Sequence, residues 1–577
     1  MVSGKKKNII LFLSIAAIIT LIAVFSIAAF YSQEGRGILH IEPGKSYLWL
    51  KTQDLTIDGL DKDGVTYFFL PSFAEMTSFS QDVSMGSAYL LDGTLLSEPS
   101  YGAVQEVTVK LPDGTNAPWK ISFLHSDCLY TAYIDLVGIE KDDIAHDEYS
   151  AASLKLFSPF GKIEYTKEDI LIKGRGNTTW DAVKRPYEIK LPENYPLCGL
   201  KSSSKWALLA NFYDDTKIQN KLIMDLSGDI GMEYAIDSDW IDLYLNGEYL
   251  GNYLLCKDPG IGKGRLELNN GCLIEKDHRT DDDSPVPHFQ INDDFFKIKD
   301  PLPVTDDDLD SISLLVREAD TEIRTDKTGA GLSHIDIPSF TRRFMIDEFC
   351  FRSASMETNC YFYNKGNRLY AGPCWDYDLA CGKPLAGSYY LDYTKSLLEK
   401  IPEDALDWDS LLMKDTAYKT YYDALFRESV PVFEDVIFHR IDAYADRISA
   451  SLEMDRARWQ NAETPIRFYS SPEDKYRYLK FFLYQRLFLL ANICGYDENL
   501  PEPSFSYDGS HTIKFLYDDG SYETLEVPDG TLLGEKDLPG YGSDLYKGWE
   551  YEREDIPFSP YIPVYEDMTL VVEHGAP

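Results

Sequence analysis

Zinc-binding and thioredoxin-like motifs are missing from this 577-residue chain, although it contains nine cysteines. No two cysteines form a CxxC pair, and none clusters with histidines at the spacing of a structural zinc site. Both kinds of centre are therefore disfavoured. Four cysteines lie close together in sequence: Cys350, Cys360, Cys374 and Cys381. Outside the cell one or two disulfides are possible, whereas a reducing compartment would leave free thiols.

Basic residues are few: the chain has 56 Lys and Arg against 95 Asp and Glu, for a formal net charge of -39. Nucleic acid would be repelled along most of such a surface, so we expect no nucleic-acid partner. Any anionic ligand must bind in a local basic pocket. Alternatively, the acidic residues simply form a solvated surface that keeps the protein soluble.

Long apolar runs are also absent, except at the N-terminus. There the lysines of MVSGKKK precede an uncharged apolar run from Ile9 to Tyr31, which is long enough to span a bilayer. The lysines favour the cytosolic side, so we expect a membrane anchor with the rest of the chain on the extracellular side. A cleaved signal peptide, which would make the protein secreted, is the alternative.

The remaining composition, 44% hydrophobic and 14% aromatic, is ample for more than one packed domain. Alternating patterns and turn residues predict a β-sandwich-like domain over 38–128 and a small β-rich module over 503–577. That module resembles the β-grasp-like repeats of bacterial surface proteins. Residues 1–37 are predicted to hold a cytosolic stub, the anchor and a short linker, and 129–495 to form a mixed domain.

Within the mixed region, the stretch DLYLNGEYLGNYLL (242–255) predicts a β-hairpin with Asn246 and Gly247 in its turn. Apolar residues at helical spacing predict helices over 307–324, 337–354, 416–453 and 473–495. The expected fold class is therefore α+β.

A local basic segment lies at 169–191, DILIKGRGNTTWDAVKRPYEIKL. Its basic residues are Lys173, Arg175, Lys184, Arg185 and Lys190. Gly174 and Gly176 would let backbone N–H groups approach a ligand, which is typical of a phosphate site. The alternative is a glycine-containing turn between two strands whose basic side chains face water.

Two aspartates one residue apart, Asp376 and Asp378, lie in GPCWDYDLACG (372–382). On a strand, alternation would place both carboxylates on one face and Trp375 with Tyr377 on the other. Magnesium binds through one or two carboxylates and keeps its other positions for water and substrate phosphates. A carboxylate pair and a basic segment together predict phosphoryl transfer. The alternative is a solvent-exposed pair at a strand end.

Six stretches resemble, in order, the signatures of the spore-coat protein H (CotH) kinase family: IKGRGNTTW, KRPYEIKL, KWALLANFYDDTKIQNKL, DLYLNGEYLGNYLL, LIEKDHR and YFYNKGNRLYAGPCWDYDLACG. The resemblance covers about residues 129–495. It implies an atypical kinase with a remote protein-kinase-like fold, which uses ATP and Mg²⁺ (or Mn²⁺) to phosphorylate secreted or coat proteins. The expected architecture is then a CotH domain flanked by two small all-β domains, after an N-terminal transmembrane helix.

The resemblance also implies roles for individual residues. Asp376 and Asp378 fall on the family's metal motif. The nucleotide-binding candidates are Lys173, Arg175, Asn177, Lys184, Lys190, Lys217, Asn220 and Glu275. For Lys217, Asn220 and Glu275, a helix cap or a buried ion pair would explain the same residues.

The chain departs from the family at one place. Many members carry an aspartate, thought to act catalytically, about two dozen residues before the second metal aspartate, and here that position is Ala354. Glu357 could serve from the next helical turn, so Asp376 and Glu357 are the predicted catalytic residues. Without such a group, the loss of general-base catalysis costs about a hundred- to ten-thousand-fold in rate.

The sequence thus predicts a surface-anchored kinase that transfers the γ-phosphate of ATP to Ser or Thr of secreted or envelope proteins. One alternative is a catalytically weak or inactive pseudokinase that acts as a binding or envelope-assembly module. Another is a nucleotide-dependent transferase that attaches a different group.

Overall fold

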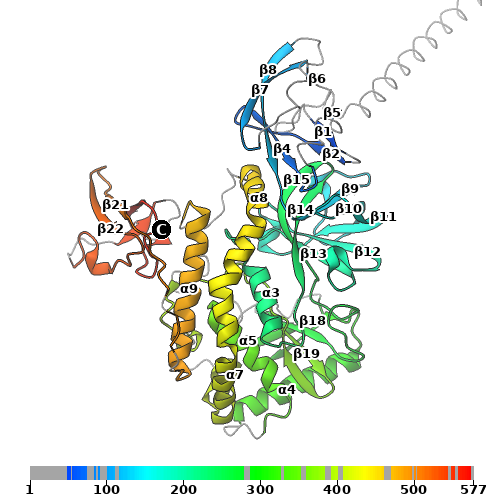
Figure 1. Ribbon diagram of the computed structural model, residues 1–577. Helices are drawn as coiled ribbons and strands as arrows, with labels where there is room; N and C mark the ends of the chain where they lie inside the picture. The colour runs from blue at the N-terminus through cyan, green and yellow to red at the C-terminus, as the bar shows by residue number, and fades with distance from the viewer. Residues whose placement is uncertain are drawn as a thin grey trace, which may run out of the picture.

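The structure is a computed structural model of the whole chain, shown in Figure 1. The residues that it describes are 49–52, 55–74, 84–85, 89–90, 101–110, 116–277, 286–325, 331–352, 359–383, 391–400, 407–459, 469–496, 499–501, 503–542, 548–552 and 556–573. The predicted membrane anchor lies outside these ranges. Within them, no helix has the length and apolar character needed to cross a membrane.

A closed β-barrel forms the centre of the chain (Figure 1). In barrel order its strands are β10 (Ser150–Phe157), β11 (Ile163–Gly174), β12 (Tyr187–Tyr195), β13 (Ser203–Leu209), β15 (Glu248–Cys256), β14 (Ser238–Leu245) and β9 (Tyr130–Leu136). The predicted hairpin is confirmed as β14 and β15, where Leu245 pairs with Glu248. Its turn residues Asn246 and Gly247 have φ of 50° and 89°, the positive values that a tight two-residue turn requires.

Below the barrel in Figure 1 lies a second sheet, against which helices pack. Its strand order is β17 (His288–Ile291), β18 (Asp294–Asp300), β16 (Leu273–Lys276), β19 (Cys360–Lys365) and β20 (Arg368–Ala371). Helices α4 (Asp306–Thr325) and α5 (Ile337–Cys350) pack on this sheet. The other α-helices of the described residues are α3 (Gln219–Asp229), α6 (Trp408–Lys414), α7 (Thr416–Asp435), α8 (Ile441–Trp459) and α9 (Pro472–Ile493). All four predicted helical segments are confirmed, although a π-helical turn at Val436–Arg440 separates α7 from α8.

Two further groups of strands lie at the ends of the described chain. The N-terminal strands form sheets of order β2-β1-β5 and β3-β4-β8-β7-β6, with bounds β1 Trp49–Thr52, β2 Leu55–Asp58, β3 Leu60–Lys62, β4 Val65–Leu70, β5 Ser84–Met85, β6 Tyr89–Leu90, β7 Val104–Lys110 and β8 Asn116–His125. The C-terminal sheet has the order β22-β21-β25-β23-β24, with bounds β21 Ser510–Leu516, β22 Tyr522–Pro528, β23 Trp549–Tyr551, β24 Ile556–Pro557 and β25 Met568–Val572. The domain boundaries stay predictions.

Both end regions share buried contacts with the middle of the chain. Phe68 belongs to the same hydrophobic cluster as Tyr244 of the barrel. At the other end, Arg477 of α9 forms a buried pair of hydrogen bonds, at 3.0 and 3.1 Å, with the carboxylate of Asp529. Such two-point pairing fixes orientation as well as distance. The C-terminal sheet therefore packs on α9 (Figure 1).

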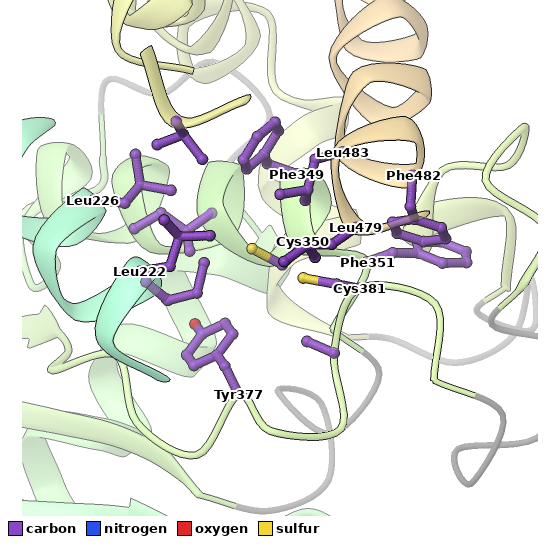
Figure 2. Close-up of a cluster of buried hydrophobic side chains, with 14 of the residues drawn as sticks. Leu222, Leu226, Phe349, Cys350, Phe351, Tyr377, Cys381, Leu479, Phe482 and Leu483 are labelled. Carbon is purple, nitrogen blue, oxygen red and sulfur yellow. The ribbon is translucent and has the colours of Figure 1, made fainter. Parts of the chain in front are cut away.

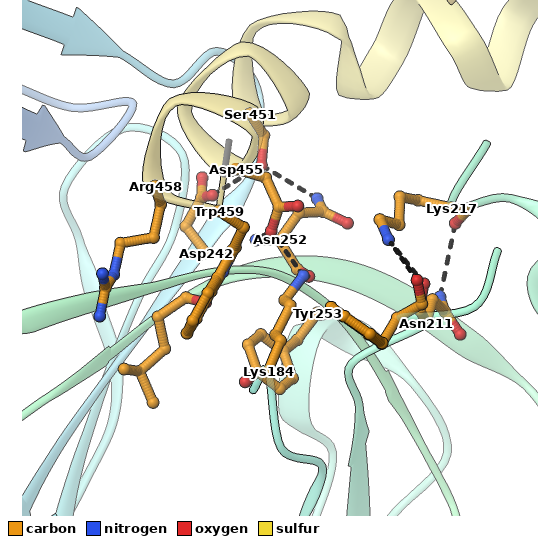
Figure 3. A network of polar contacts seen from close by, with 12 residues as sticks. Lys184, Asn211, Lys217, Asp242, Asn252, Tyr253, Ser451, Asp455, Arg458 and Trp459 are labelled. Atoms are coloured by element: carbon orange, nitrogen blue, oxygen red, sulfur yellow. Dashed lines mark hydrogen bonds and ion pairs between the residues drawn. The ribbon is translucent and has the colours of Figure 1, made fainter. Parts of the chain in front are cut away.

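A buried polar network joins α8 to the barrel (Figure 3). Lys184 Nζ lies 2.5 Å from Asp455 Oδ1 and donates to the carbonyl of Asn252 at 2.6 Å. The same carboxylate oxygen accepts from the Asn252 N–H at 2.9 Å. A Cβ on Gly251 would lie 2.2 Å from this oxygen, so only glycine allows the approach. Burial lowers the pKa of Lys184 to about 8, because the charged form loses hydration.

This network yields a test of stability. Lys184→Met or Asp455→Leu alone leaves one buried charge without its partner, so each should lower the free energy of unfolding by about 3 kcal/mol. The double variant removes both charges and should lose clearly less than the sum of the singles. Denaturant unfolding of the three variants measures this coupling. Additive losses would show that the two charges do not stabilise one another.

Candidate functional site

A pocket of about 370 Å³ lies where the barrel meets the aspartate segment. Its lining residues are Arg175, Thr179, Pro186, Leu209, Ala210, Asn211, Phe212, Asn220, Trp375, Asp376 and Asp378. Four of the residues predicted from the sequence therefore meet here: Arg175, Asn220, Asp376 and Asp378. They come from the end of β11, the start of α3 and the segment after β20, which are far apart in sequence.

The aspartates do not lie on a strand, which corrects the expected alternation. β20 ends at Ala371, and residues 372–377 have no regular structure. Gly372 and Pro373 come at this point, and proline has no N–H to donate to a sheet. Asp376 has a φ of 67°, a left-handed conformation that is unfavourable for a side chain with a Cβ.

Tyr377, between the two aspartates, is fixed at both ends. Its N–H donates to Asn220 Oδ1 at 2.7 Å, and its hydroxyl donates to Asp347 Oδ1 at 2.6 Å. Asn359 Nδ2 donates to Asp376 Oδ2 at 2.5 Å. The ring of Tyr377 points into the hydrophobic core (Figure 2), so the flanking carboxylates are left to line the pocket.

The proximity of these carboxylates has an electrostatic consequence. The pKa of Asp378 is raised well above its ordinary value, first by burial, then by the neighbouring charge of Asp376 and by Asp214. Two buried like charges are unfavourable unless a proton or a cation lies between them. The pair is thus suited to a divalent metal with oxygen ligands. In the described ranges, no group of three or more His, Cys, Asp or Glu is arranged to hold a metal ion.

Arg175 provides the positive charge of the pocket. Its guanidinium forms an ion pair with Asp258 at 2.9 Å and lies 5.0 Å from the centre of the Trp375 ring. Within the described residues its Nε is buried without a hydrogen-bond partner. A buried, unpaired donor is costly, and an anionic ligand in the pocket would satisfy it.

The two motif glycines allow close packing in this turn, and the approach of the Gly176 N–H to a ligand stays a prediction. A Cβ on Gly174 would lie 2.5 Å from the ring of Trp180, and the Gly174 N–H already donates to Ala145 at 2.8 Å. At Gly176, with φ 82°, a Cβ would lie 2.1 Å from Thr179 Oγ1. The two glycines therefore allow the turn to fold against Thr179 and Trp180.

The other nucleotide-binding candidates do not line this pocket. Three are held by internal contacts: Lys184 by Asp455, Lys217 by the carbonyls of Asn211 and Phe212, and Glu275 by Lys297 and Lys299.

The remaining three lie nearer the surface. Lys173 lies over the ring of Tyr149, and Asn177 and Lys190 are exposed. The nucleotide-binding roles of all six residues stay predictions. Ala354 and Glu357 lie outside the described residues, so the catalytic role of Glu357 also stays a prediction.

Two asparagines at the site were missed from the sequence. Asn211 lines the pocket with a φ of 46° and accepts from Asn220 Nδ2 at 2.9 Å. Asn359, with a φ of 55°, holds Asp376. Asparagine tolerates the left-handed conformation better than most residues, and such strain is concentrated at functional sites. The only indication in the sequence was their position: Asn211 lies shortly after one apolar strand, and Asn359 lies directly before another.

The fold and the pocket define an α+β protein whose candidate site pairs two carboxylates with a half-buried arginine. The sequence profile of one family, described as CotH kinase protein, matches residues 172–490, which is more than half of the chain. The chain belongs to the CotH kinase family. A comparison with curated proteins finds no match.

The two neighbouring carboxylates should favour cation binding but lower the stability of the metal-free protein. Asp378→Asn removes a buried charge that lies beside the like charge of Asp376, so in metal-free buffer at neutral pH it should raise the unfolding midpoint by about 3 °C. Asp214→Asn is the matched control, since it removes a buried charge that accepts hydrogen bonds from the Thr216 N–H, the Thr216 hydroxyl and the Gln219 N–H. That variant should be less stable. A lower midpoint for Asp378→Asn would contradict the account.

The same pair predicts a pH dependence. A carboxyl whose pKa is raised by folding binds its proton more tightly in the folded state. Its contribution to stability therefore falls as pH rises from the ordinary aspartate pKa through the raised value. Thermal unfolding of the metal-free parent across this range should show that slope, and Asp378→Asn should reduce it. Equal slopes would show that Asp378 has no raised pKa.

Proposed function

We propose that the chain is an atypical protein kinase that uses Mg²⁺ (or Mn²⁺) and ATP to phosphorylate Ser or Thr of a secreted or envelope protein. Membership of the CotH kinase family supports an atypical kinase. The observation that carries the proposal is the convergence of Asp376, Asp378 and Arg175 on one pocket. That set supplies oxygen ligands for a divalent cation and a donor for phosphate oxygens.

The residues of the pocket would have different roles. Asp376 and Asp378 would hold the metal, which when bound neutralises phosphate charge. Arg175 would orient the phosphates, because Asp258 and Trp375 fix its guanidinium. Asn220 and Asn359 would keep the carboxylates aimed at the pocket through their contacts with Tyr377 and Asp376. Glu357 would accept the proton of the substrate hydroxyl.

A second candidate function rests on Ala354, which replaces the aspartate that many family members carry. A chain without that group could bind nucleotide and transfer phosphate slowly or not at all. It would then serve as a binding or envelope-assembly module. In either case the apolar run from Ile9 to Tyr31 would anchor the protein, with the pocket on the extracellular side.

The first experiment is thermal unfolding of the full-length protein with and without Mg-ATP. Saturation to about a hundred times the dissociation constant stabilises a folded protein by about 2.7 kcal/mol, so the parent midpoint should rise by a few degrees. Asp376→Ala should abolish the rise because a metal ligand is lost. Asp508→Ala, an exposed aspartate in the C-terminal region, is the control and should keep it.

Transfer of labelled γ-phosphate to protein in the same samples separates the two candidate functions. Transfer that falls by about a hundredfold or more in Asp376→Ala supports the kinase. A midpoint shift without transfer supports the pseudokinase. If the unfolding midpoint does not shift at saturating Mg-ATP, the nucleotide-binding proposal is wrong.

A further inference from the structure

A pair of buried thiols lies directly behind the aspartate segment. Cys350 is the last residue of α5, and Cys381 follows Asp378 by three residues. The Cys381 N–H donates to the Cys350 carbonyl at 2.8 Å. Burial, and after it the neighbouring Cys381 side chain, raises the pKa of the Cys350 thiol well above its ordinary value. Figure 2 shows the two sulfur atoms side by side in the hydrophobic core. Both cysteines are free.

The neighbouring cysteines are held in other contacts. Cys374 Sγ lies 3.6 Å from Met232 Sδ, and Cys360 Sγ accepts from Arg343. A disulfide requires two Cβ atoms about 4 Å apart, with side chains that face one another. Within the described residues, Cys350 and Cys381 meet the second requirement, and their backbone hydrogen bond brings the two main chains together.

Both thiols are buried in the folded protein, with 0% of Cys350 and 1% of Cys381 exposed. Cys381 borders a small cavity together with Asp215, Lys383 and Lys475, whereas Cys350 does not line it. Glutathione disulfide is too large for this cavity, so it reaches the thiols only when the structure opens locally, and Cys381 is then the first to react.

A bond between these thiols would enclose the whole aspartate segment. The loop from 350 to 381 contains β19, β20, Asp376 and Asp378. At its first end, directly after Cys350, Arg352 lies with its guanidinium 4.2 Å from the centre of the Tyr377 ring. A cross-link would tie this end of α5 to the chain that leaves the aspartates.

We propose that Cys350 and Cys381 form a redox-active dithiol, and that their oxidation to a disulfide fixes the segment that carries Asp376 and Asp378. A small-molecule disulfide such as oxidised glutathione is the oxidant. The Cys381 thiolate attacks it and releases one glutathione thiolate. The Cys350 thiolate then attacks the mixed disulfide and releases the second. Two protein thiols lose two protons and two electrons, and one glutathione disulfide is reduced to two glutathione molecules.

The test uses the full-length protein, purified under reducing conditions and then equilibrated with oxidised glutathione until the pattern of alkylation no longer changes. Free thiols are blocked, the protein is digested, and the peptides are identified by mass spectrometry. The expected product is a cross-linked peptide pair that contains Cys350 and Cys381 and is two hydrogens lighter than the separate peptides. Two alkylated thiols at equilibrium, or a bond from either cysteine to Cys374, would overturn the proposal.

A second measurement compares the unfolding midpoints of the oxidised and reduced forms. Closing a loop of this length should raise the midpoint by about 5 °C. Cys350→Ala and Cys381→Ala should each lose the difference between the two forms. Cys494→Ala, a buried cysteine at the end of α9, is the matched control and should keep it. A difference that survives in Cys381→Ala would also overturn the proposal.

Only the functional consequence of the disulfide rests on the proposed kinase function. The oxidised form should keep the Mg-ATP midpoint shift, because the disulfide holds both aspartates at the pocket. If the nucleotide proposal fails, the cross-link still forms but neither form responds to Mg-ATP. If the dithiol proposal fails, the cross-link is absent while the reduced protein responds to Mg-ATP.

Discussion

The repulsion between two neighbouring carboxylates, of which Asp378 is buried and Asp376 half-buried, is the constraint on which this site depends. Asp376 and Asp378 share one pocket, and burial together with their mutual repulsion raises the pKa of Asp378. Left to itself, such a pair would turn toward water. The surrounding structure prevents this movement by fixing the residue between them, because the backbone N–H and the hydroxyl of Tyr377 are both held by buried partners. The result is a site prepared for a cation.

The partners that fix this site are themselves fixed by the fold. Asn220 lies in the first turn of α3, Asp347 lies in α5, and Asn359 precedes β19, so three elements meet at one short segment. On the barrel side, the Lys184–Asp455 pair attaches α8 to β15 near the same pocket (Figure 3). The family motifs are therefore divided between two tasks. Some line the pocket, while others, including Lys184 and Gly174, hold together the elements that form it.

Local pattern was enough to predict much of the fold. The β14–β15 hairpin followed from Asn246-Gly247 between alternating strands, and the helices followed from apolar spacing. The carboxylate pair and Arg175 were predicted from residue type and family resemblance, and the structure brings them to one pocket. The interpretation of both carboxylates on one strand face does not hold, because the sheet ends at Ala371 and alternation alone does not show where a sheet ends. Asn211 and Asn359 were missed because a local pattern does not show that the turns around them fold toward the pocket.

A local motif also does not show which way a buried side chain points. Glu275 and Lys184 were nucleotide-binding candidates because of their charges. In the structure Glu275 pairs with Lys297 and Lys184 pairs with Asp455, because a buried charge requires a partner.

The central claim is that Asp376 and Asp378 form one divalent-cation site. Electron paramagnetic resonance of Mn²⁺ titrated into the protein with ATP tests it most directly. The account predicts bound Mn²⁺ in the parent and none in Asp376→Ala. Equal binding in both proteins, or none in the parent, would contradict it.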